Sequence, residues 1–385
     1  MNRFLLLLLI PALSGCAASQ NPSASSTESK AEDTAAYYDL SEGRIVQKNA
    51  RENTQQVVSA PSELPTSFVA KAKHSNKQVV WYEYPFWLDG TLLSDPKNKD
   101  KFNDILYKRV GSKYYKAQVE GAFNALDWGV KRDYEGGTDN SPFLQAMFDY
   151  FPQGYTASVY IPTGNYHFKT GLVLEGKPIH LFGDNGTIFS PYSTKLFFPA
   201  NETGIYVGRQ VSNAQEIIIE NLCLIGGGGT MERDGISLRG RFTLRGITTK
   251  GFPHHGISVW ANMAEGNDAS GSLIEKCHSL ENGKDGFFLG RTDANSITVI
   301  ACDTRDNGRY GFNEDSFLGN NYISCMAHYN KAGDYFVRDK ANNRSSFISC
   351  YSEGGNKVSQ LGPKSTVVGG VWGTGYSLNG KDVLY

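Results

Sequence analysis

A repeat of about two dozen residues, running through residues 272–353, constrains the fold more than any other feature of the chain. It reads LIEKCHSLENGKDGFFLG, VIACDTRDNGRYGFNED, YISCMAHYNKAGDYFVRD and, in part, FISCYSEGGN. Its cysteines recur at intervals of 25, 23 and 25 residues, at Cys277, Cys302, Cys325 and Cys350. A unit this short cannot bury a core of its own, so each must pack against the next. The repeat therefore predicts a solenoid.

Each unit consists of short alternating apolar runs broken by Asn-Gly or Gly, without the spacing of an amphipathic helix. This pattern predicts an all-β fold, the right-handed parallel β-helix, in which equivalent residues of successive coils lie about 4.8 Å apart. Two columns are expected in the core: Leu222, Ile247 and the four cysteines, and, two places on, Thr249, Ser279, Thr304, Ala327 and Ser352. The cysteines are expected to be free, because parallel side chains on neighbouring coils suit a disulfide poorly.

A third column contains Asn282, Asn307 and Asn330, each five places after a cysteine. Asparagine tolerates the backbone angles of turns, and its amide can bind the coils above and below. We therefore expect an asparagine ladder at one turn of the solenoid.

The N-terminal part of the chain differs in composition from the repeats. Residues 1–15 carry Arg3 and an apolar run, which is typical of a secretory signal. The sequence Leu13-Ser14-Gly15-Cys16 resembles a bacterial lipobox. This resemblance implies lipidation of Cys16, and with Ala17 next it favours an outer-membrane lipoprotein. Residues 16–61 are small and polar, which predicts a flexible tether.

Residues 62–118 contain the aromatic run WYEYPFW and are expected to cap the solenoid, with a fold that the sequence leaves open. The β-helix domain is assigned to residues 119–385. Within it, LDWGV at 126–130, GTDN at 137–140 and VYIPTGNY at 159–166 resemble the opening of pectate-lyase-superfamily proteins. The resemblance implies a parallel β-helix with an N-terminal capping helix, expected at residues 141–151 behind Asp139 and Asn140. That family contains polysaccharide lyases, hydrolases and C5-epimerases.

Five segments, DGISLRG, HGISVWA, DGFFLGR, YGFNEDS and GDYFVRD, align as neighbouring strands of one sheet. Side chains of a strand alternate between its two faces. The outward set is Ser237, Arg239, Ser258, Trp260, Phe288, Asn313, Asp315, Phe336 and Arg338. Aromatic rings stack on sugars and guanidinium groups pair with carboxylates, so this face suits an acidic polysaccharide. We assign substrate binding to Trp260, Phe288, Asn313, Phe336 and Arg338. The alternative is that loops cover the rings and the charges pair with each other.

Immediately before these strands lies a further column, Asp234, His255, Asp285 and Tyr310. Titratable groups at one coil spacing shift each other's pKa, which suits acid–base catalysis. His254 is expected to face the other way and is an alternative base. The simpler interpretation is that the Asp-Gly and His-Gly pairs only form the turn.

Two reactions fit these residues. In β-elimination, Arg239 or Arg338 would neutralise a uronate carboxylate, and His254, His255 or Tyr310 would remove the C5 proton. In hydrolysis, two of Asp234, Asp285, Glu314 and Asp315 would act as acid and base. The motif set of polygalacturonase-like hydrolases is missing, which favours a lyase. Glu314 aligns with inward leucines, so either the register slips there or a buried carboxyl with a raised pKa is present.

Other classes of function fit less well. A net charge of −1 argues against a nucleic-acid partner. Without HxH, HExxH or CxxC motifs no zinc site is expected, although calcium held by Asp and Glu of neighbouring coils stays open. A monomer is expected. A non-catalytic lipoprotein that binds exopolysaccharide is the main alternative to an enzyme, whereas the lipobox disfavours a viral tailspike relative.

Overall fold

The computed structural model describes residues 66–383, with gaps at 76, 209–215, 340–341, 354–358, 374 and 379–380, and three strands between residues 34 and 57. These strands, β1 (Thr34–Asp39), β2 (Arg44–Asn49) and β3 (Thr54–Val57), form an antiparallel sheet. The prediction of a flexible tether for residues 16–61 did not include these strands, because short β-favouring runs can pair even in a polar segment. Cys16 and the predicted signal lie outside the described residues.

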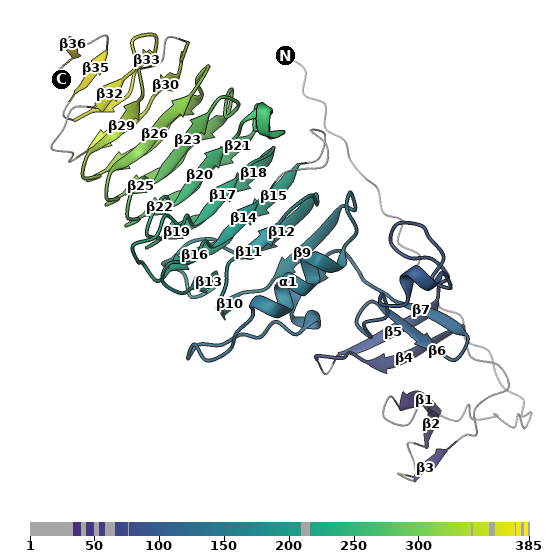
Figure 1. Ribbon diagram of the computed structural model, residues 1–385. Coiled ribbons are helices and arrows are strands. Elements are labelled where there is room, and N and C mark those ends of the chain that lie inside the picture. The colour runs from purple at the N-terminus through teal and green to yellow at the C-terminus, as the bar shows by residue number, and fades with distance from the viewer. Residues whose placement is uncertain are drawn as a thin grey trace, which may run out of the picture.

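A second antiparallel sheet, the N-terminal sheet, has the strand order β4-β5-β7-β6. Its strands are β4 (Ser67–Lys71), β5 (Gln78–Glu83), β6 (Tyr107–Val110) and β7 (Lys113–Ala117), with the 3-10 helix η1 (Pro96–Asn98) in a connecting loop. The sheet lies beside the first coils of the solenoid (Figure 1). The rings of Trp87 and Tyr150 are 4.8 Å apart, and the Tyr150 hydroxyl donates to the Lys101 carbonyl. This segment thus packs on the end of the solenoid, where the sequence predicted a cap.

The rest of the chain is a parallel β-helix, as predicted, built from three long sheets (Figure 1). We call the first the site sheet. Its strands, in order, are β11 (Leu172–Leu174), β14 (Ile205–Val207), β17 (Ile236–Leu238), β20 (Ile257–Trp260), β23 (Phe287–Arg291), β26 (Tyr310–Ser316), β29 (Gly333–Val337), β32 (Ser359–Leu361), β35 (Tyr376–Leu378) and β36 (Lys381–Val383). All are parallel neighbours except β36, which returns antiparallel to β35.

The second sheet contains β10 (Gly164–His167), β13 (Thr194–Phe198), β16 (Cys223–Gly226), β19 (Thr248–Lys250), β22 (His278–Leu280), β25 (Asp303–Arg305), β28 (Met326–His328), β31 (Tyr351–Glu353) and β34 (Val371–Trp372). The third contains β8 (Phe123–Asn124), β9 (Ala157–Ile161), β12 (Ile179–Gly183), β15 (Ile217–Glu220), β18 (Phe242–Arg245), β21 (Leu273–Glu275), β24 (Thr298–Ile300), β27 (Asn321–Ile323), β30 (Ser346–Ile348) and β33 (Thr366–Val368). Each coil contributes one strand to each sheet, and the 3-10 helix η3 (Met263–Glu265) lies in a loop after β20.

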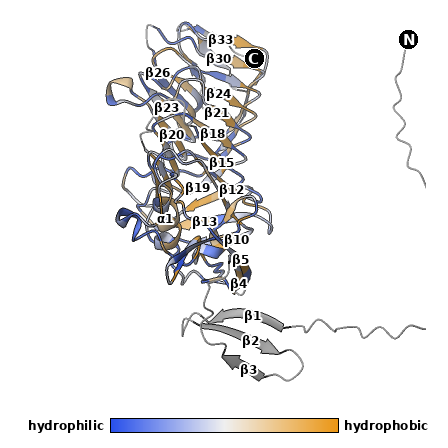
Figure 2. Ribbon diagram, turned by 90° about the vertical axis from the view of Figure 1, so that its right-hand side faces the viewer, coloured by the Kyte–Doolittle hydropathy of each residue, from blue (hydrophilic) through white to orange (hydrophobic). Residues whose placement is uncertain are grey.

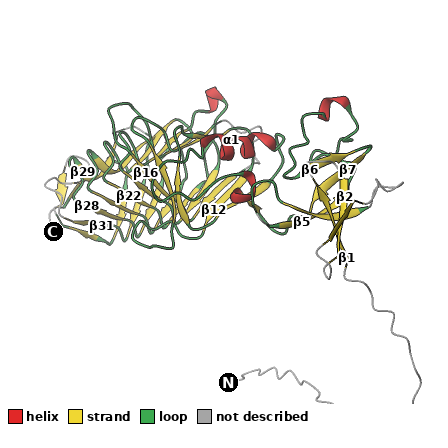
Figure 3. Ribbon diagram, turned by 90° about the horizontal axis from the view of Figure 1, so that it is seen from below, coloured by secondary structure: helices red, strands yellow, loops and turns green. Residues whose placement is uncertain are grey.

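One α-helix occurs in the described part of the chain, α1 (Ser141–Tyr150), which ends one residue before the predicted boundary. It follows the 3-10 helix η2 (Ala125–Trp128) and lies at the N-terminal end of the solenoid (Figure 3). Asp139 accepts the Ser141 amide, whereas Asn140 binds the backbone of Lys131. Leu144, Met147 and Phe148 are buried, so the helix covers the core at that end.

The predicted core columns are confirmed. Leu222, Ile247 and the four repeat cysteines are fully buried, and no described cysteine is in a disulfide. In Figure 2 hydrophobic colour follows the strands and hydrophilic colour the loops. None of the helices in the part of the chain that the structure describes is long and apolar enough to span a membrane.

The asparagine ladder is also confirmed. Asn307 Oδ1 accepts both the backbone N–H and the side-chain amide of Asn282, at 2.9 and 3.0 Å. Asn330 Oδ1 accepts the same two groups from Asn307, at 3.1 and 2.9 Å. The ladder fixes the turn that leads from the second sheet into the site sheet.

Candidate functional site

The candidate site lies where the chain enters strands β17, β20, β23 and β26 of the site sheet. Ile236, Ile257, Phe287 and Phe312 pair in register, so Asp234, His255, Asp285 and Tyr310 occupy one column two residues earlier. The glycines that follow are required by the core. A Cβ at Gly256, for example, would lie 1.9 Å from Ser279 Oγ. The dipeptides therefore do form the turn, and in doing so they place titratable groups side by side.

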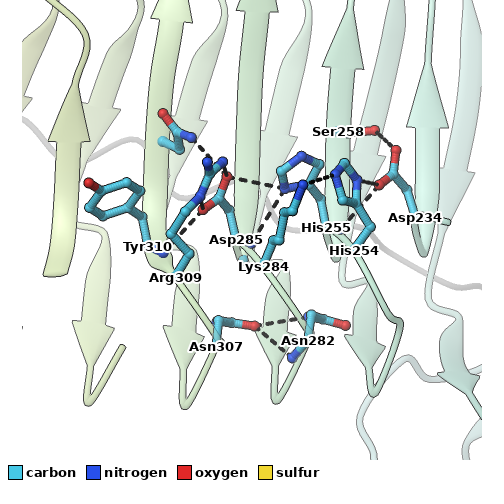
Figure 4. A network of polar contacts seen from close by, with 12 residues as sticks. Asp234, His254, His255, Ser258, Asn282, Lys284, Asp285, Asn307, Arg309 and Tyr310 are labelled. Atoms are coloured by element: carbon cyan, nitrogen blue, oxygen red, sulfur yellow. Dashed lines mark hydrogen bonds and ion pairs between the residues drawn. The ribbon is translucent and has the colours of Figure 1, made fainter. Parts of the chain in front are cut away.

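One half of the site is centred on Asp234. Its Oδ1 accepts from His254 Nδ1 at 2.7 Å and from the His255 amide at 3.1 Å, and its Oδ2 accepts from Ser258 Oγ at 2.5 Å (Figure 4). The other ring nitrogen of His254, Nε2, accepts a hydrogen bond from the Lys284 ammonium at 3.0 Å. Both ring nitrogens of His254 are thus engaged.

The other half is centred on Asp285, which is fully buried. Arg309 binds both of its oxygens, with Nε at 2.7 Å from Oδ1, and the side-chain amide of Asn313 donates to Oδ2 at 2.8 Å. His255 Nδ1 lies 3.1 Å from the same Oδ2 (Figure 4). The backbone N–H of Asp285 also points to Nδ1, at the longer distance of 3.4 Å. Because the contact with the carboxylate is shorter, we place the ring proton on Nδ1. Nε2 then keeps its lone pair, and no hydrogen bond to it occurs among the described residues.

The expectation that His254 faces away from His255 is wrong. The two ring centroids are 3.8 Å apart, and both rings are buried. The pair precedes β20, so the alternation of an extended strand does not apply to it. His254 is nevertheless unsuited to be the base, because Asp234 and Lys284 occupy its two nitrogens.

The environment favours a neutral His255 between ionised carboxylates. Burial lowers the pKa of His255, although Asp285 and Asp234 act in the opposite direction. Burial alone would raise the pKa of Asp234, but the hydrogen bonds from His254 and Ser258 lower it overall. For Asp285 burial also acts upward, and the bonds from Arg309 and His255 hold its pKa well below the usual range. Neither aspartate is therefore protonated at neutral pH.

The predicted aromatic residues divide into two groups. Phe288 is buried and stacks on the His255 ring at 4.8 Å, so it supports the histidine. Trp260 is half-buried and packs on Phe288 at 4.4 Å. Phe336 is half-buried and stacks with Tyr310 at 4.4 Å. Trp260, Tyr310 and Phe336 are thus the rings available to a ligand.

The predicted charged residues lie further along the same strands, in the column of Trp260. Arg338 forms an ion pair with Asp315 at 3.2 Å, so the alternative of mutual pairing holds for these two. Arg239 is different, because its Nε is buried without a hydrogen-bonding partner among the described residues. The Oδ1 of Asn313 is likewise buried without such a partner. Arg239 as a whole is half-buried and stays a candidate to bind a substrate, whereas Asn313 is buried.

Glu314 faces the core and not the outward face of the site sheet. It is buried in register with Leu289 and Val337, so the alternative of a register slip is wrong. Burial raises its pKa, while Ser316, Asn320 and Tyr322 donate to its oxygens. This matches the predicted buried carboxyl and removes Glu314 from the candidate catalytic residues.

Sequence reasoning missed Lys284, Arg309 and the supporting role of Ser258. A signal for the first two was present, because each directly precedes a member of the predicted column. His254 holds the same position, and its amide and that of Lys284 bond to the carbonyl of the equivalent residue one coil earlier. The basic residues form a column of their own.

A metal ion has a possible site here. One ligand atom each of Asp234, His254 and His255 lies within 4.8 Å of the others. Two imidazoles suit a transition metal better than the calcium considered from the sequence, which prefers oxygen ligands. The Lys284 ammonium on His254 Nε2 opposes a second cation at this position.

No protein-family model and no curated protein matches the chain. Among solved structures, it is similar to the tailspike protein gp49 of Acinetobacter baumannii bacteriophage Fri1, a capsular polysaccharide depolymerase. The TM-score is 0.53 at 14% identity, covering 82% of this chain and 67% of that one. The gp42 tailspike of Acinetobacter phage vb_AbaP_AS12 gives 0.52 at 13% identity, covering 80% and 54%. At these identities the likeness shows the fold alone, so it does not decide between a tailspike relative and another parallel β-helix protein.

Proposed function

We propose that this protein is an extracytoplasmic enzyme that cleaves an acidic polysaccharide by β-elimination, with His255 as the base. The observation that carries the proposal is the pair of His255 and Asp285. Asp285 holds Nδ1 of a buried imidazole with a lowered pKa and leaves Nε2 unoccupied. Such a group is neutral and ready to accept a proton at neutral pH.

In the proposed reaction, Arg239, which is half-buried on the outward face of the site sheet, binds the carboxylate of a uronate residue. This neutralises the carboxylate and makes the neighbouring C5 proton more acidic. His255 Nε2 takes that proton, the electron pair forms the C4–C5 double bond, and the C4–O bond breaks. The leaving oxygen takes a proton from water. Asp285 stabilises the imidazolium that forms.

Hydrolysis by paired carboxylates is the second candidate, and the pKa directions oppose it. A hydrolase needs one protonated carboxyl as general acid. Asp234 and Asp285 both have lowered pKa values, and Glu314 faces the core. Asp315 is already paired with Arg338. A C5-epimerase would begin with the same proton abstraction, and a binding lipoprotein would need only the exposed rings.

The similarity in fold to a capsular polysaccharide depolymerase supports a polysaccharide ligand without defining it. We further propose that Cys16 is lipidated and anchors a monomer to the outer membrane. Replacement of Cys16 by serine should then release the protein from the membrane fraction.

The test is incubation of the purified protein with polygalacturonate, alginate, hyaluronan and bacterial capsular polysaccharides. The ultraviolet absorbance of unsaturated uronate and the formation of reducing ends are followed together. Both should rise for one polymer, and His255→Gln should abolish them. His278→Gln, on the second sheet, is the matched control. Reducing ends without absorbance would establish a hydrolase, whereas tight binding without either signal would leave a binding protein.

A further inference from the structure

A cleft of about 740 Å³ lies between the N-terminal sheet and the first coils of the solenoid, on a different sheet from the histidine site. Strands β5 and β7 and the chain that follows β7 form one wall, and β8, β9, β12 and η2 form the other. This volume is in the range of about 300–1,000 Å³ that is typical of sites for small ligands. Figure 3 shows the two parts of the chain that border it.

The solenoid wall of the cleft is aromatic. Tyr160 and Phe182 occupy equivalent positions of neighbouring coils and stack with centroids 5.3 Å apart. Both are half-buried, as is Phe123. The opposite wall exposes Val80 and Val119 by 41% and 40%. Isolated exposed valines are ordinary, but here they line the same cleft as the stacked rings.

Polar groups surround these apolar surfaces. Asp184 accepts from the Tyr160 hydroxyl at 2.7 Å and fixes that ring, and Lys77 lies 3.7 Å from Asp127. Gln118 and Glu120 add amide and carboxylate groups. The indole N–H of Trp81, which also lines the cleft, is buried without an acceptor among the described residues.

These features select a class of ligand. The lining contains two lysines, Lys73 and Lys77, and three acids, Glu120, Asp127 and Asp184, so it has no excess of positive charge for a polyanion. Ring faces beside hydrogen-bonding side chains suit a molecule with apolar faces and a rim of hydroxyl groups. A neutral sugar has this character.

We propose that the cleft is a second saccharide-binding site, which holds a neutral oligosaccharide segment away from the histidine site. The choice of a saccharide rests on the proposed function, whereas the cleft itself does not. The two sites lie on different sheets, so they would bind separate parts of a polymer, and the cleft would keep the enzyme on its substrate between cleavages.

The experiment measures binding of neutral hexasaccharides, namely cellohexaose, maltohexaose and chitohexaose, to the full chain by calorimetry. At least one should bind, and Phe182→Ala should weaken it about tenfold through loss of ring contact. Val119→Lys places a charge in the cleft from an exposed position and should weaken binding similarly. Phe189→Ala is the matched control, because Phe189 is 81% exposed and does not line the cleft. His255→Gln should bind as the wild type does.

Thermal unfolding establishes that each variant is folded. If no hexasaccharide binds, or if folded Phe182→Ala and Val119→Lys both bind as the wild type does, the cleft is not a saccharide site. Binding that is lost in His255→Gln would place the neutral sugar at the histidine site and would also overturn the proposal. Failure of the proposed function looks different: either no polymer is cleaved or His255→Gln retains turnover, while Phe182→Ala still loses binding of the neutral hexasaccharide.

Discussion

Replacement of Asp285 by asparagine is the most direct test of the proposed base. The change keeps the size of the side chain and removes its charge. Asp285 is fully buried, and Arg309, which binds both of its oxygens, keeps 38% of its side chain exposed. Breaking a fully buried pair costs about 3–5 kcal/mol. Because the arginine is partly solvated, we expect a loss of about 2–3 kcal/mol in the free energy of unfolding.

The effect on the rate should be larger than this loss of stability implies. Without the carboxylate, Nδ1–H and the developing imidazolium of His255 lose their charged partner. A positioned acid–base group contributes about 10²–10⁴-fold, so kcat should fall by that factor while KM changes little. The acid limb of the pH profile should also move to lower pH, because Asp285 raises the pKa of His255 against burial.

The assay combines denaturant unfolding with kcat and KM for the polymer identified above. Asp303→Asn is the matched control, because Asp303 lies on β25 of the second sheet beside His278 and His328. A variant that loses stability but keeps kcat within a few-fold of the wild type would refute the argument. Asp285 would then only secure the turn.

Four further predictions follow from the same contacts. Activity should rise with pH through an apparent pKa below the ordinary histidine value of about 6.5, because burial lowers the pKa of His255 and the base must be neutral. A pH–rate profile of kcat/KM whose acid limb lies above that value would contradict this prediction. Asn307→Ala should lower the free energy of unfolding by about 2–4 kcal/mol, because it leaves two buried donors of Asn282 without an acceptor. Asn342→Ala, outside the ladder, is the control and should change it little; denaturant unfolding measures both. Lys284→Met should bind Zn²⁺ more tightly than the wild type in calorimetry, because the change removes the ammonium from His254 Nε2. Equal affinity would mean that the lysine does not prevent a cation from binding to Asp234, His254 and His255. Arg239→Met should raise KM for the acidic polymer about tenfold or more. Arg338→Met should not, because Arg338 is already paired with Asp315. Equal effects of the two changes would show that Arg239 has no special role in binding the polymer.

The repeat was sufficient to predict which residues share a column. The cysteine spacing fixes the length of a coil, and parallel pairing then places equivalent residues of successive coils side by side. The burial of Cys302, the asparagine ladder around Asn307 and the inward position of Glu314 all follow from this register.

The repeat does not predict which side chains touch each other within a column or between adjacent columns. At a corner of the coil the backbone leaves the extended conformation, so the rings of neighbours such as His254 and His255 can lie close together. The N-terminal sheet was equally inaccessible, because its pairing lacks a repeat that would reveal the register.

The side chains of the site are held in place by contacts between two columns, the basic residues and the column of Asp234, His255 and Asp285, and these contacts are offset by one coil. His254 binds Asp234, and Arg309 binds Asp285, so in both cases a basic residue of one coil holds the carboxylate of the coil before. This offset neutralises the carboxylates inside the protein and fixes His255 between them. It also means that His254, Lys284 and Arg309 of the basic column already have partners within the protein. In the proposed reaction, recognition of substrate charge falls to Arg239, which is half-buried on the outward face of the site sheet. In this proposal, catalysis and charge recognition belong to different columns of the same sheet.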